Sequence, residues 1–353
     1  MRDGLVTPST LDTRRSAASG WKIVGWYESI LSNCFDYGSP IHYRVYGTVS
    51  CTIRDCGGVR PVGGTVNGHP DYYTGFCIGR HSTSFGFIGA NASLTVENCY
   101  SAGAVGTDRM GLYLFGYIGD TWIKKFEDSQ LEYGVFIDGA DASGVTLTAL
   151  TAHQDVRVQE CVLDAHLFNC VTVQNINAGG SITVGGDTYC SLNAAGDAVL
   201  VNNAMGTVSI PEADIVGGSS YANYGVRISG SKRVSIGDGV KIKDCRVGLR
   251  AESSSALCMT PIITRANTGG TNAVELAGVG RSYLAPVIDG INSSFDYCIT
   301  ADSASNYSEI NLSGVLFSCL TTTSATRKIW SNGATWGGGG TFGNNNIATG
   351  VLN

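Results

Sequence analysis

The chain has little proline, few charged residues and no long apolar run. Of its 353 residues 7 are proline and 15% are charged, whereas 48 are glycine and 43% are hydrophobic. This composition favours a large core in which glycine serves turns and stacked strands rather than disorder. No apolar stretch approaches about 18 residues, which argues against a membrane span. The net charge of -6, without a Lys or Arg run, argues against nucleic acid as a partner.

Motifs of common cofactor and metal sites are also missing. There are 12 cysteines but no Cys-x-x-Cys, and the five histidines have no paired ligand spacing. No Gly-x-Ser-x-Gly, His-Glu-x-x-His, phosphate loop or dinucleotide fingerprint occurs. We therefore expect no cofactor and no metal. We interpret the cysteines as small hydrophobic residues stacked in a core rather than as a disulfide framework.

A four-residue phrase recurs along the chain: an aliphatic residue, any residue, an Asn, Asp or Glu, and then Cys. Clear copies end at Cys34, Cys56, Cys99, Cys161 and Cys245, and looser copies occupy 126–129, 173–176 and 263–266. The phrase fits a strand that ends in a tight polar corner, with the Asn or Asp in the left-handed conformation. Its step of about 22 residues indicates a solenoid.

A second phrase places Gly or a small residue before an apolar-x-apolar triplet. It occurs at 75–78, 111–114, 134–137, 225–228 and 272–276, and each copy predicts a strand with one buried face. Helical spacing is limited to a short piece at 11–18. The two phrases together predict an all-β, right-handed, single-stranded parallel β-helix of roughly 10–13 coils.

The predicted β-helix covers residues 26–325. Residues 1–25 form an N-terminal cap or junction, and residues 326–353 form a Gly- and Asn-rich end or junction. The opening residues lack the apolar core of a signal peptide, so we expect either a chain that is not exported by that route or a piece of a longer protein.

Loops are inserted where the interval between corners exceeds the basic step. Residues 57–74 and 100–110 leave the same corner of successive coils, and 138–153 lies on the return side. In repeat proteins such insertions gather on one face, which is often the binding face. They can equally decorate the surface without a binding role.

The residue before each polar corner points outward. Successive copies read Arg54, Glu97, Glu127, Gln159 and Gln174. Because stacked strands lie about 4.8 Å apart, Glu97 and Glu127 are predicted to be neighbouring carboxylates beside the inserted loops. Such a pair can divide into an acid and a base or nucleophile, as glycoside hydrolysis requires. An exposed polar ladder explains the same pattern.

Other candidates flank this pair. Asp128 is either a third catalytic carboxylate or a turn residue. Flat rings suit the apolar faces of sugars, and an Arg can bind an acidic sugar, but rings can also pack under loops and Arg can pair locally. The residues predicted to contact substrate are Arg54, His69, Asp71, Tyr73, Asp108, Arg109, Tyr113 and Phe136.

A second constellation is cationic. Its members are Arg227, Lys241, Lys243, Arg246, Arg250 and Arg265. A Lys or Arg base beside a second cation is what β-elimination of a uronic acid requires. These coils lack inserted loops, which favours a solvated charged face.

The repeated coil, the Asn/Asp-Cys corners and the Gly-led strands resemble the pectate-lyase-like parallel β-helix superfamily over most of the chain. The signatures of its polygalacturonase and calcium-dependent pectate lyase branches are absent, so no site residue is carried over. In style the chain is similar to bacteriophage tailspikes and capsule depolymerases. That resemblance implies a homotrimer in the virion tail, folded in a reducing bacterial cytoplasm and acting outside the cell on a capsule or O-antigen polysaccharide.

Three functions remain open from the sequence. The first is a polysaccharide depolymerase, an endo-glycosidase that uses Glu97 and Glu127. The second is a non-catalytic glycan-binding or receptor-binding fibre. The third is a polysaccharide lyase that acts on a uronic acid.

Overall fold

The structure is a computed structural model in which the chain divides into two compact units, Met1–Tyr189 and Cys190–Asn353. Within the described residues all regular structure is β, the strands pair in parallel, and no long apolar helix that could cross a membrane occurs. The short helix predicted at 11–18 lies outside them. The described residues are 19–39, 41–59, 74–79, 91–103, 110–116, 118–139, 154–217, 223–266, 270–289, 297–302, 305, 309–311, 315–316, 320–323, 329–330 and 342–343.

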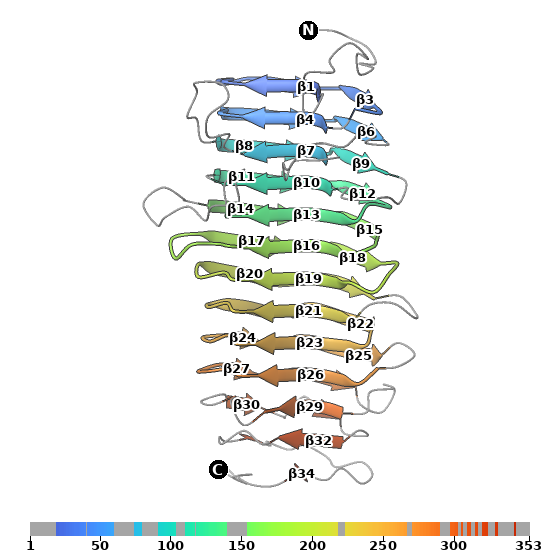
Figure 1. Cartoon of the computed structure of the whole chain (residues 1–353), viewed down its shortest axis with the longest axis vertical. Coiled ribbons are helices and arrows are strands. Elements are labelled where there is room, and N and C mark those ends of the chain that lie inside the picture. The colour runs from blue at the N-terminus through green and yellow to red at the C-terminus, as the bar shows by residue number, and fades with distance from the viewer. Residues whose placement is uncertain are drawn as a thin grey trace, which may run out of the picture. The chain divides into compact units, whose positions relative to one another are not determined.

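Three ladders of parallel strands build the first unit (Figure 1). The first ladder contains β1 (Ser19–Val24), β4 (Ile41–Tyr46), β7 (Thr74–Gly79), β10 (Met110–Phe115), β13 (Tyr133–Asp138) and β16 (Asn169–Gln174). The second contains β2 (Ile30–Ser32), β5 (Val49–Arg54), β8 (Asn91–Glu97), β11 (Ile118–Lys124), β14 (Gln154–Gln159) and β17 (Ser181–Gly185). The third contains β3 (Phe35–Tyr37), β6 (Gly57–Val59), β9 (Tyr100–Ala102), β12 (Glu127–Ser129) and β15 (Val162–His166).

The chain visits the three ladders in turn and then starts again one strand further along. Each set of three consecutive strands is called a repeat below. This order is compatible with a parallel β-helix, because every strand pairs with its counterpart in the next repeat rather than with its neighbour in the sequence. Single apolar positions such as Leu112, Val135 and Val171 therefore meet in register and form the core.

Second-ladder strands end at corners in the left-handed conformation. The φ angles are 55° at Asn33, 53° at Asp55 and 52° at Asn98. Glu160 and Asp244 have φ angles of 55° and 59°. Asn and Asp adopt this conformation more readily than other non-Gly residues. The predicted left-handed polar residue is thus confirmed at all five Cys-containing copies of the phrase, although Asp244 lies within a strand, Val234–Cys245, rather than after its end.

Four of the five cysteines after these corners are buried, and Cys34 is half-buried. Cys56, Cys99 and Cys161 each direct Sγ at the carbonyl oxygen two residues earlier, at 3.2, 3.3 and 3.3 Å. Cys99 Sγ also lies 3.6 Å from the carbonyl oxygen of Ile53 in the preceding repeat. A thiol is a small apolar group with a weak donor. It therefore suits a tight corner in which backbone carbonyls face inward.

Larger rings fill the interior of the early repeats. Tyr43 stacks on Phe76 with ring centroids 4.5 Å apart, and Phe126 meets Phe76 edge-on at 5.6 Å. All three side chains are fully buried. The Tyr43 hydroxyl lies 2.6 Å from the carbonyl oxygen of Cys34, so its polar end is satisfied inside the core.

The second unit repeats the parallel pattern, with two longer strands, β20 and β22, and several strands of only two or three residues. One ladder contains β19 (Asp197–Asn202), β21 (Tyr224–Ser229), β23 (Val247–Glu252), β26 (Asn272–Ala277), β29 (Tyr297–Ala301), β32 (Leu320–Thr323) and β34 (Phe342–Gly343). The other strands are β20 (Thr207–Val216), β22 (Val234–Cys245), β24 (Cys258–Met259), β25 (Ile262–Ala266), β27 (Tyr283–Leu284), β28 (Val287–Asp289), β30 (Glu309–Asn311), β31 (Val315–Leu316) and β33 (Ile329–Trp330). The strand β18 (Thr188–Leu192) spans the boundary between the units.

Candidate functional site

Glu97 and Glu127 lie on different ladders. Glu97 ends β8, where its neighbours in register are Arg54 on β5 and Lys124 on β11. Glu127 begins β12, and its neighbour on β9 is Tyr100. The predicted adjacency of the two carboxylates is therefore wrong. Glu97 instead lies between two cations in a polar ladder in which Arg54 is exposed and Glu97 and Lys124 are half-buried, as expected of a charged surface.

The wrong prediction that Glu97 and Glu127 are adjacent arises in one repeat, whose corner has neither Asn nor Cys. Lys125 is the left-handed residue there, with a φ angle of 51°, and Phe126 takes the place that Cys has elsewhere. The phrase assigned to 126–129 is thus shifted along the chain. The copy at 173–176 is displaced too, because Gln174 ends β16 on the first ladder, and Gly185 is the residue that pairs with Gln159.

Asp128 points into the protein. Its side chain is buried on β12, and its Oδ1 lies 2.5 Å from Nε2 of His166, which is also buried. Burial raises the pKa of the Asp128 carboxyl, and the nearby His166 opposes that rise. An enclosed carboxyl of this kind cannot reach a polysaccharide on the surface. Asp128 is therefore a buried residue of the interior and not the catalytic carboxylate that the sequence predicted.

Tyr113 and Phe136 pack against each other. This agrees with the alternative prediction, in which these rings pack within the protein rather than contact a sugar. They are neighbours in register on β10 and β13, and their rings meet edge-on at 5.6 Å. Tyr113 also stacks on Phe115 at 5.0 Å and is only 2% exposed, so it presents no open face to a sugar. Phe136 is half-buried. Five other predicted residues lie outside the described part of the chain: His69, Asp71, Tyr73, Asp108 and Arg109.

An exposed row of aromatic rings lies on the third ladder, and the sequence patterns did not single it out. This aromatic row consists of Phe35, Tyr37 and Tyr100, which are 36%, 42% and 40% exposed. Phe35 and Tyr100 share one register through Gly57 on the intervening strand, and their ring centroids are 6.2 Å apart. The available signal was the residue after each corner Cys, since Phe35 follows Cys34 and Tyr100 follows Cys99.

Gly57 lets the Tyr100 ring lie flat across the ladder. A Cβ atom at this position would overlap the Tyr100 ring, and the backbone of Gly57 has no left-handed strain of its own. The absence of a side chain here therefore creates the space in which the ring reaches toward Phe35. Burial on one side raises the pKa of the Tyr100 hydroxyl, as expected of a ring that lies against the protein surface.

The charges on this face are acidic. Among the five strands of the third ladder the outward charged side chains are Glu127 and Asp164, both exposed, and these strands contain no Lys or Arg. Glu127 continues the register of Phe35 and Tyr100, and Asp164 lies opposite Ser129 on the next strand. The surface thus combines flat apolar rings with carboxylates at one edge.

The cationic constellation of the second unit is only partly assembled. Arg227 and Arg250 are neighbours on β21 and β23, but both bind carboxylates. Arg227 lies 2.6 Å from Glu252 and 3.6 Å from Asp197, and Arg250 lies 2.8 Å from Glu252 and 3.1 Å from Glu275. Such paired guanidinium groups are poor candidates for a free base. Lys241 is separate from them on β22, where it lies 3.8 Å from Asp214.

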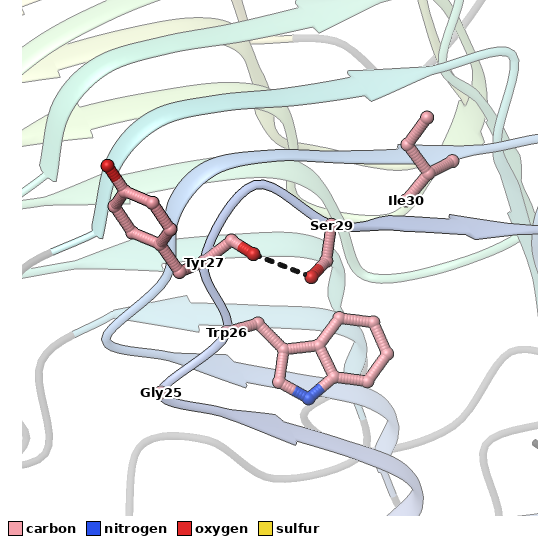
Figure 2. A pocket seen from close by; sticks show the side chains of 5 residues that line it. All are labelled: Gly25, Trp26, Tyr27, Ser29 and Ile30. Atoms are coloured by element: carbon pink, nitrogen blue, oxygen red, sulfur yellow. Dashed lines mark hydrogen bonds between the residues drawn. The ribbon is translucent and has the colours of Figure 1, made fainter.

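A shallow depression lies at the start of the first unit. It is lined by Gly25, Trp26, Tyr27, Ser29 and Ile30, and Ser29 Oγ donates a 2.8 Å hydrogen bond to the carbonyl oxygen of Tyr27. Figure 2 shows that the Trp26 and Tyr27 rings point in different directions. They do not form a slot that would hold a sugar between two faces.

Taken as a class, the protein is an all-β chain with long sheets of parallel strands, compatible with a solenoid of the parallel β-helix type. Comparison of the chain with protein-family models, with curated proteins and with solved structures gave no match. Among the described residues, no group of three or more His, Cys, Asp or Glu side chains is arranged to hold a metal ion.

Proposed function

We propose that the chain is a β-helix of the tailspike type that binds a bacterial surface polysaccharide along the aromatic row. The observation that carries the proposal is the exposure of Phe35, Tyr37 and Tyr100 on one ladder, with Phe35 and Tyr100 in one register. Exposed rings on a flat parallel sheet offer apolar faces at regular spacing, which suits a chain of pyranose rings. Right-handed coiling follows from the strong preference of parallel crossover connections, and roughly 10–13 coils are proposed with it.

The charge of the surface defines the kind of sugar. Because the strands of this ladder direct carboxylates but no Lys or Arg outward, a uronic acid would meet repulsion rather than a partner. Neutral sugars, or amino sugars with a free amine, fit better. The acidic face therefore favours a polysaccharide without uronic acids. A uronate lyase could not cleave such a polysaccharide. Homotrimer formation and a place in a virion tail belong to the same proposal and rest on the resemblance alone.

The binding proposal predicts that Tyr100→Ala weakens polysaccharide binding about fivefold, since a stacked ring contributes on the order of 1 kcal/mol. Gly57→Ala is expected to have a similar effect, because its Cβ displaces the Tyr100 ring without removing it. Calorimetric titration with neutral, amino and acidic polysaccharides measures this. Tyr283→Ala is the matched control, since Tyr283 is 36% exposed in the second unit. Equal affinities for all three variants would rule out the aromatic row as the binding surface.

A second candidate function is cleavage of the bound polysaccharide. Glu127 stands next to Tyr100 in register, and Asp164 lies one strand over and two residues further along. Strand spacing and rise place two such outward residues about 8 Å apart. That separation lies within the roughly 6.5–9.5 Å between the acid and base of an inverting glycosidase. Asp164 therefore replaces Glu97 as the partner of Glu127 in an endo-glycosidase.

The cleavage proposal predicts that Glu127→Gln and Asp164→Asn each lower the rate about a hundredfold, because each removes one acid–base group. Polysaccharide affinity is expected to change little. The measurement is the release of reducing ends, read together with ultraviolet absorbance from unsaturated products. Glu97→Gln serves as the control and should retain full activity. A polysaccharide that is bound but never shortened would leave the protein a glycan-binding fibre.

A further inference from the structure

A column of polar side chains runs through the interior of the first unit beneath the third ladder. Asp36, Ser101 and Asp128 point inward from β3, β9 and β12, and their strands pair in order through β6. On β6 the inward position is Gly58, and the imidazole of His42 from β4 fills the space that a side chain there would take. These side chains are no more than 3% exposed.

Several polar atoms of the column have no hydrogen-bond partner among the described residues. They are Asp36 Oδ2, both ring nitrogens of His42, Ser101 Oγ and Asp128 Oδ2. Asp128 Oδ1 and His166 Nε2 likewise have no partner apart from the 2.5 Å contact between them. Buried polar groups without partners are costly, and a charge on them is costlier still. The protonation states that the column can hold are therefore limited by the need to avoid buried net charge.

The geometry at the end of the column fixes the number of protons there. His166 Nδ1 lies 3.3 Å from the carbonyl oxygen of Leu131, which can only accept a hydrogen bond, so Nδ1 carries a proton. In the neutral imidazole Nε2 then has a lone pair. Since Nε2 lies 2.5 Å from Asp128 Oδ1, two lone pairs would face each other unless one proton lies between them.

Other proton counts would bury a net charge. With no shared proton the pair is an isolated carboxylate, and with a second proton it is an isolated imidazolium. The groups packed around Asp128 do not supply a compensating charge. They are Gly111 from β10, Ser101 from β9 and Leu163 from β15, and the charge of exposed Asp164 raises the pKa of Asp128 further. On the His166 side lie Gly134 and the carbonyl oxygen of Leu131, and the buried titratable residue Glu132 follows Leu131 in the chain.

We propose that Asp128 and His166 share a single proton throughout the pH range in which the first unit is folded, and that this pair makes the fold sensitive to alkaline pH. The pair is interior, beneath the third ladder, and does not itself reach the surface to which a polysaccharide would bind. It is a device for stability rather than for catalysis.

The sign of the effect follows from proton counting. In the unfolded chain a histidine loses its proton near pH 6.5, and an aspartate loses its proton near pH 3.9. Above about pH 6.5 the unfolded chain therefore holds no proton on these two residues, while the folded pair keeps one. Folding then binds a proton, and the folding equilibrium constant falls about tenfold for each further pH unit until the pair itself ionises. The raised pKa of Asp128 agrees with this direction.

The other titratable members of the column act in a different pH window. Burial raises the pKa of Asp36 to about 6 and lowers the pKa of His42 to about 4. Asp36 alone would make stability fall as pH rises toward 6, and His42 alone would make it fall as pH drops toward 4. Between these values the folded state holds one proton on Asp36 and the unfolded state one on His42, so their effects cancel. Above about pH 6.5 neither state holds a proton on either residue.

The test is urea unfolding of the full chain at intervals from pH 6.5 to pH 8.5. The wild type should lose about tenfold more in its folding constant per pH unit than Asp128→Asn, because the ionisation of the chain's 12 cysteines on unfolding adds the same pH dependence to both proteins. Asp128→Asn should lack this additional loss, because an amide donates to His166 Nε2 without titrating, and it should become the more stable protein at the alkaline end. Glu160→Gln, which changes an exposed carboxylate elsewhere in the first unit, should follow the wild type.

Equal pH dependence in the wild type and in Asp128→Asn would overturn the proposal. If Asp128→Asn does not fold, the ¹⁵N resonances of His166 in the wild-type protein decide the question. The shared proton requires that they stay constant from pH 6.5 to pH 8.5. A titration of these resonances within that range would show that the pair does not hold its proton.

Discussion

Replacing Gly134 by alanine is expected to destabilise the first unit by about 3 kcal/mol or more, although only one methyl group is added. A Cβ atom at this position on β13 would overlap the carbonyl oxygen of Cys170 and lie 3.0 Å from Nε2 of His166. Cys170 belongs to β16, the neighbouring strand of the same ladder, so its carbonyl cannot move away without disturbing strand pairing. Urea unfolding of the full chain measures the loss.

A comparison with Gly111 separates backbone clashes from side-chain clashes. A Cβ atom at Gly111 would overlap Asp128 Oδ2, whereas the nearest backbone atom, the carbonyl oxygen of Gly134, lies 3.0 Å away. Shortening the side chain in the double variant Gly111→Ala/Asp128→Ala should therefore recover part of the lost stability. Gly134→Ala/His166→Ala should recover little, because the carbonyl remains.

Gly179→Ala is the control for both variants. Its Cβ would lie 3.6 Å from Asn177 Oδ1, an ordinary contact, and its backbone is not left-handed. An alanine at such a site changes stability by only about 0.4–1 kcal/mol, in the stabilising direction. If Gly134→Ala unfolded at the same urea concentration as Gly179→Ala, that result would contradict the close approach of β16 to Gly134 on β13.

These glycines explain why one sequence phrase predicted strands so well. The Gly before each apolar-x-apolar triplet was interpreted only as a small residue at a strand start. The structure gives its cause at Gly111 and Gly134, where inward polar groups of the third ladder occupy the space next to the strand. Period-two burial and left-handed Asn or Asp corners are local properties, and local properties are what a single sequence displays.

The position of the candidate site could not be derived in the same way. At the corner in the fourth repeat, Lys125 replaces the usual Asn or Asp, so the template matched further along the chain and assigned Asp128 to a corner. Side chains alternate between faces, and a small error in register therefore changes which residues are neighbours. Whether Tyr100 stands exposed depends on Gly57 in the preceding repeat, a relation between residues far apart in the sequence.

The same repeat provides a strong test of the packing. Phe126→Ala is expected to cost about 3–5 kcal/mol of unfolding free energy, because the ring is fully buried and its loss leaves a cavity. The ring meets Phe76 edge-on at 5.6 Å, and Phe76 in turn stacks on Tyr43 at 4.5 Å. Removing Phe126 thus also removes support from two other aromatic side chains. Phe168→Ala, at a ring that is 45% exposed, should cost much less.

The variant Phe126→Cys tests whether the stability of this repeat depends on filling the interior or on matching the Cys that the other repeats have. The corners of the neighbouring repeats have Cys99 and Cys161 at this position, so a consensus argument expects the cysteine variant to be as stable as the wild type or more so. The packing argument expects the opposite, since a thiol fills only part of the volume of a phenyl ring and leaves the edge of Phe76 uncovered. Urea unfolding of the two variants beside the wild type decides between them. A cysteine variant as stable as the wild type would mean that the repeat closes around the smaller side chain, whereas a loss close to that of Phe126→Ala would mean that the interior of this repeat is built around the ring.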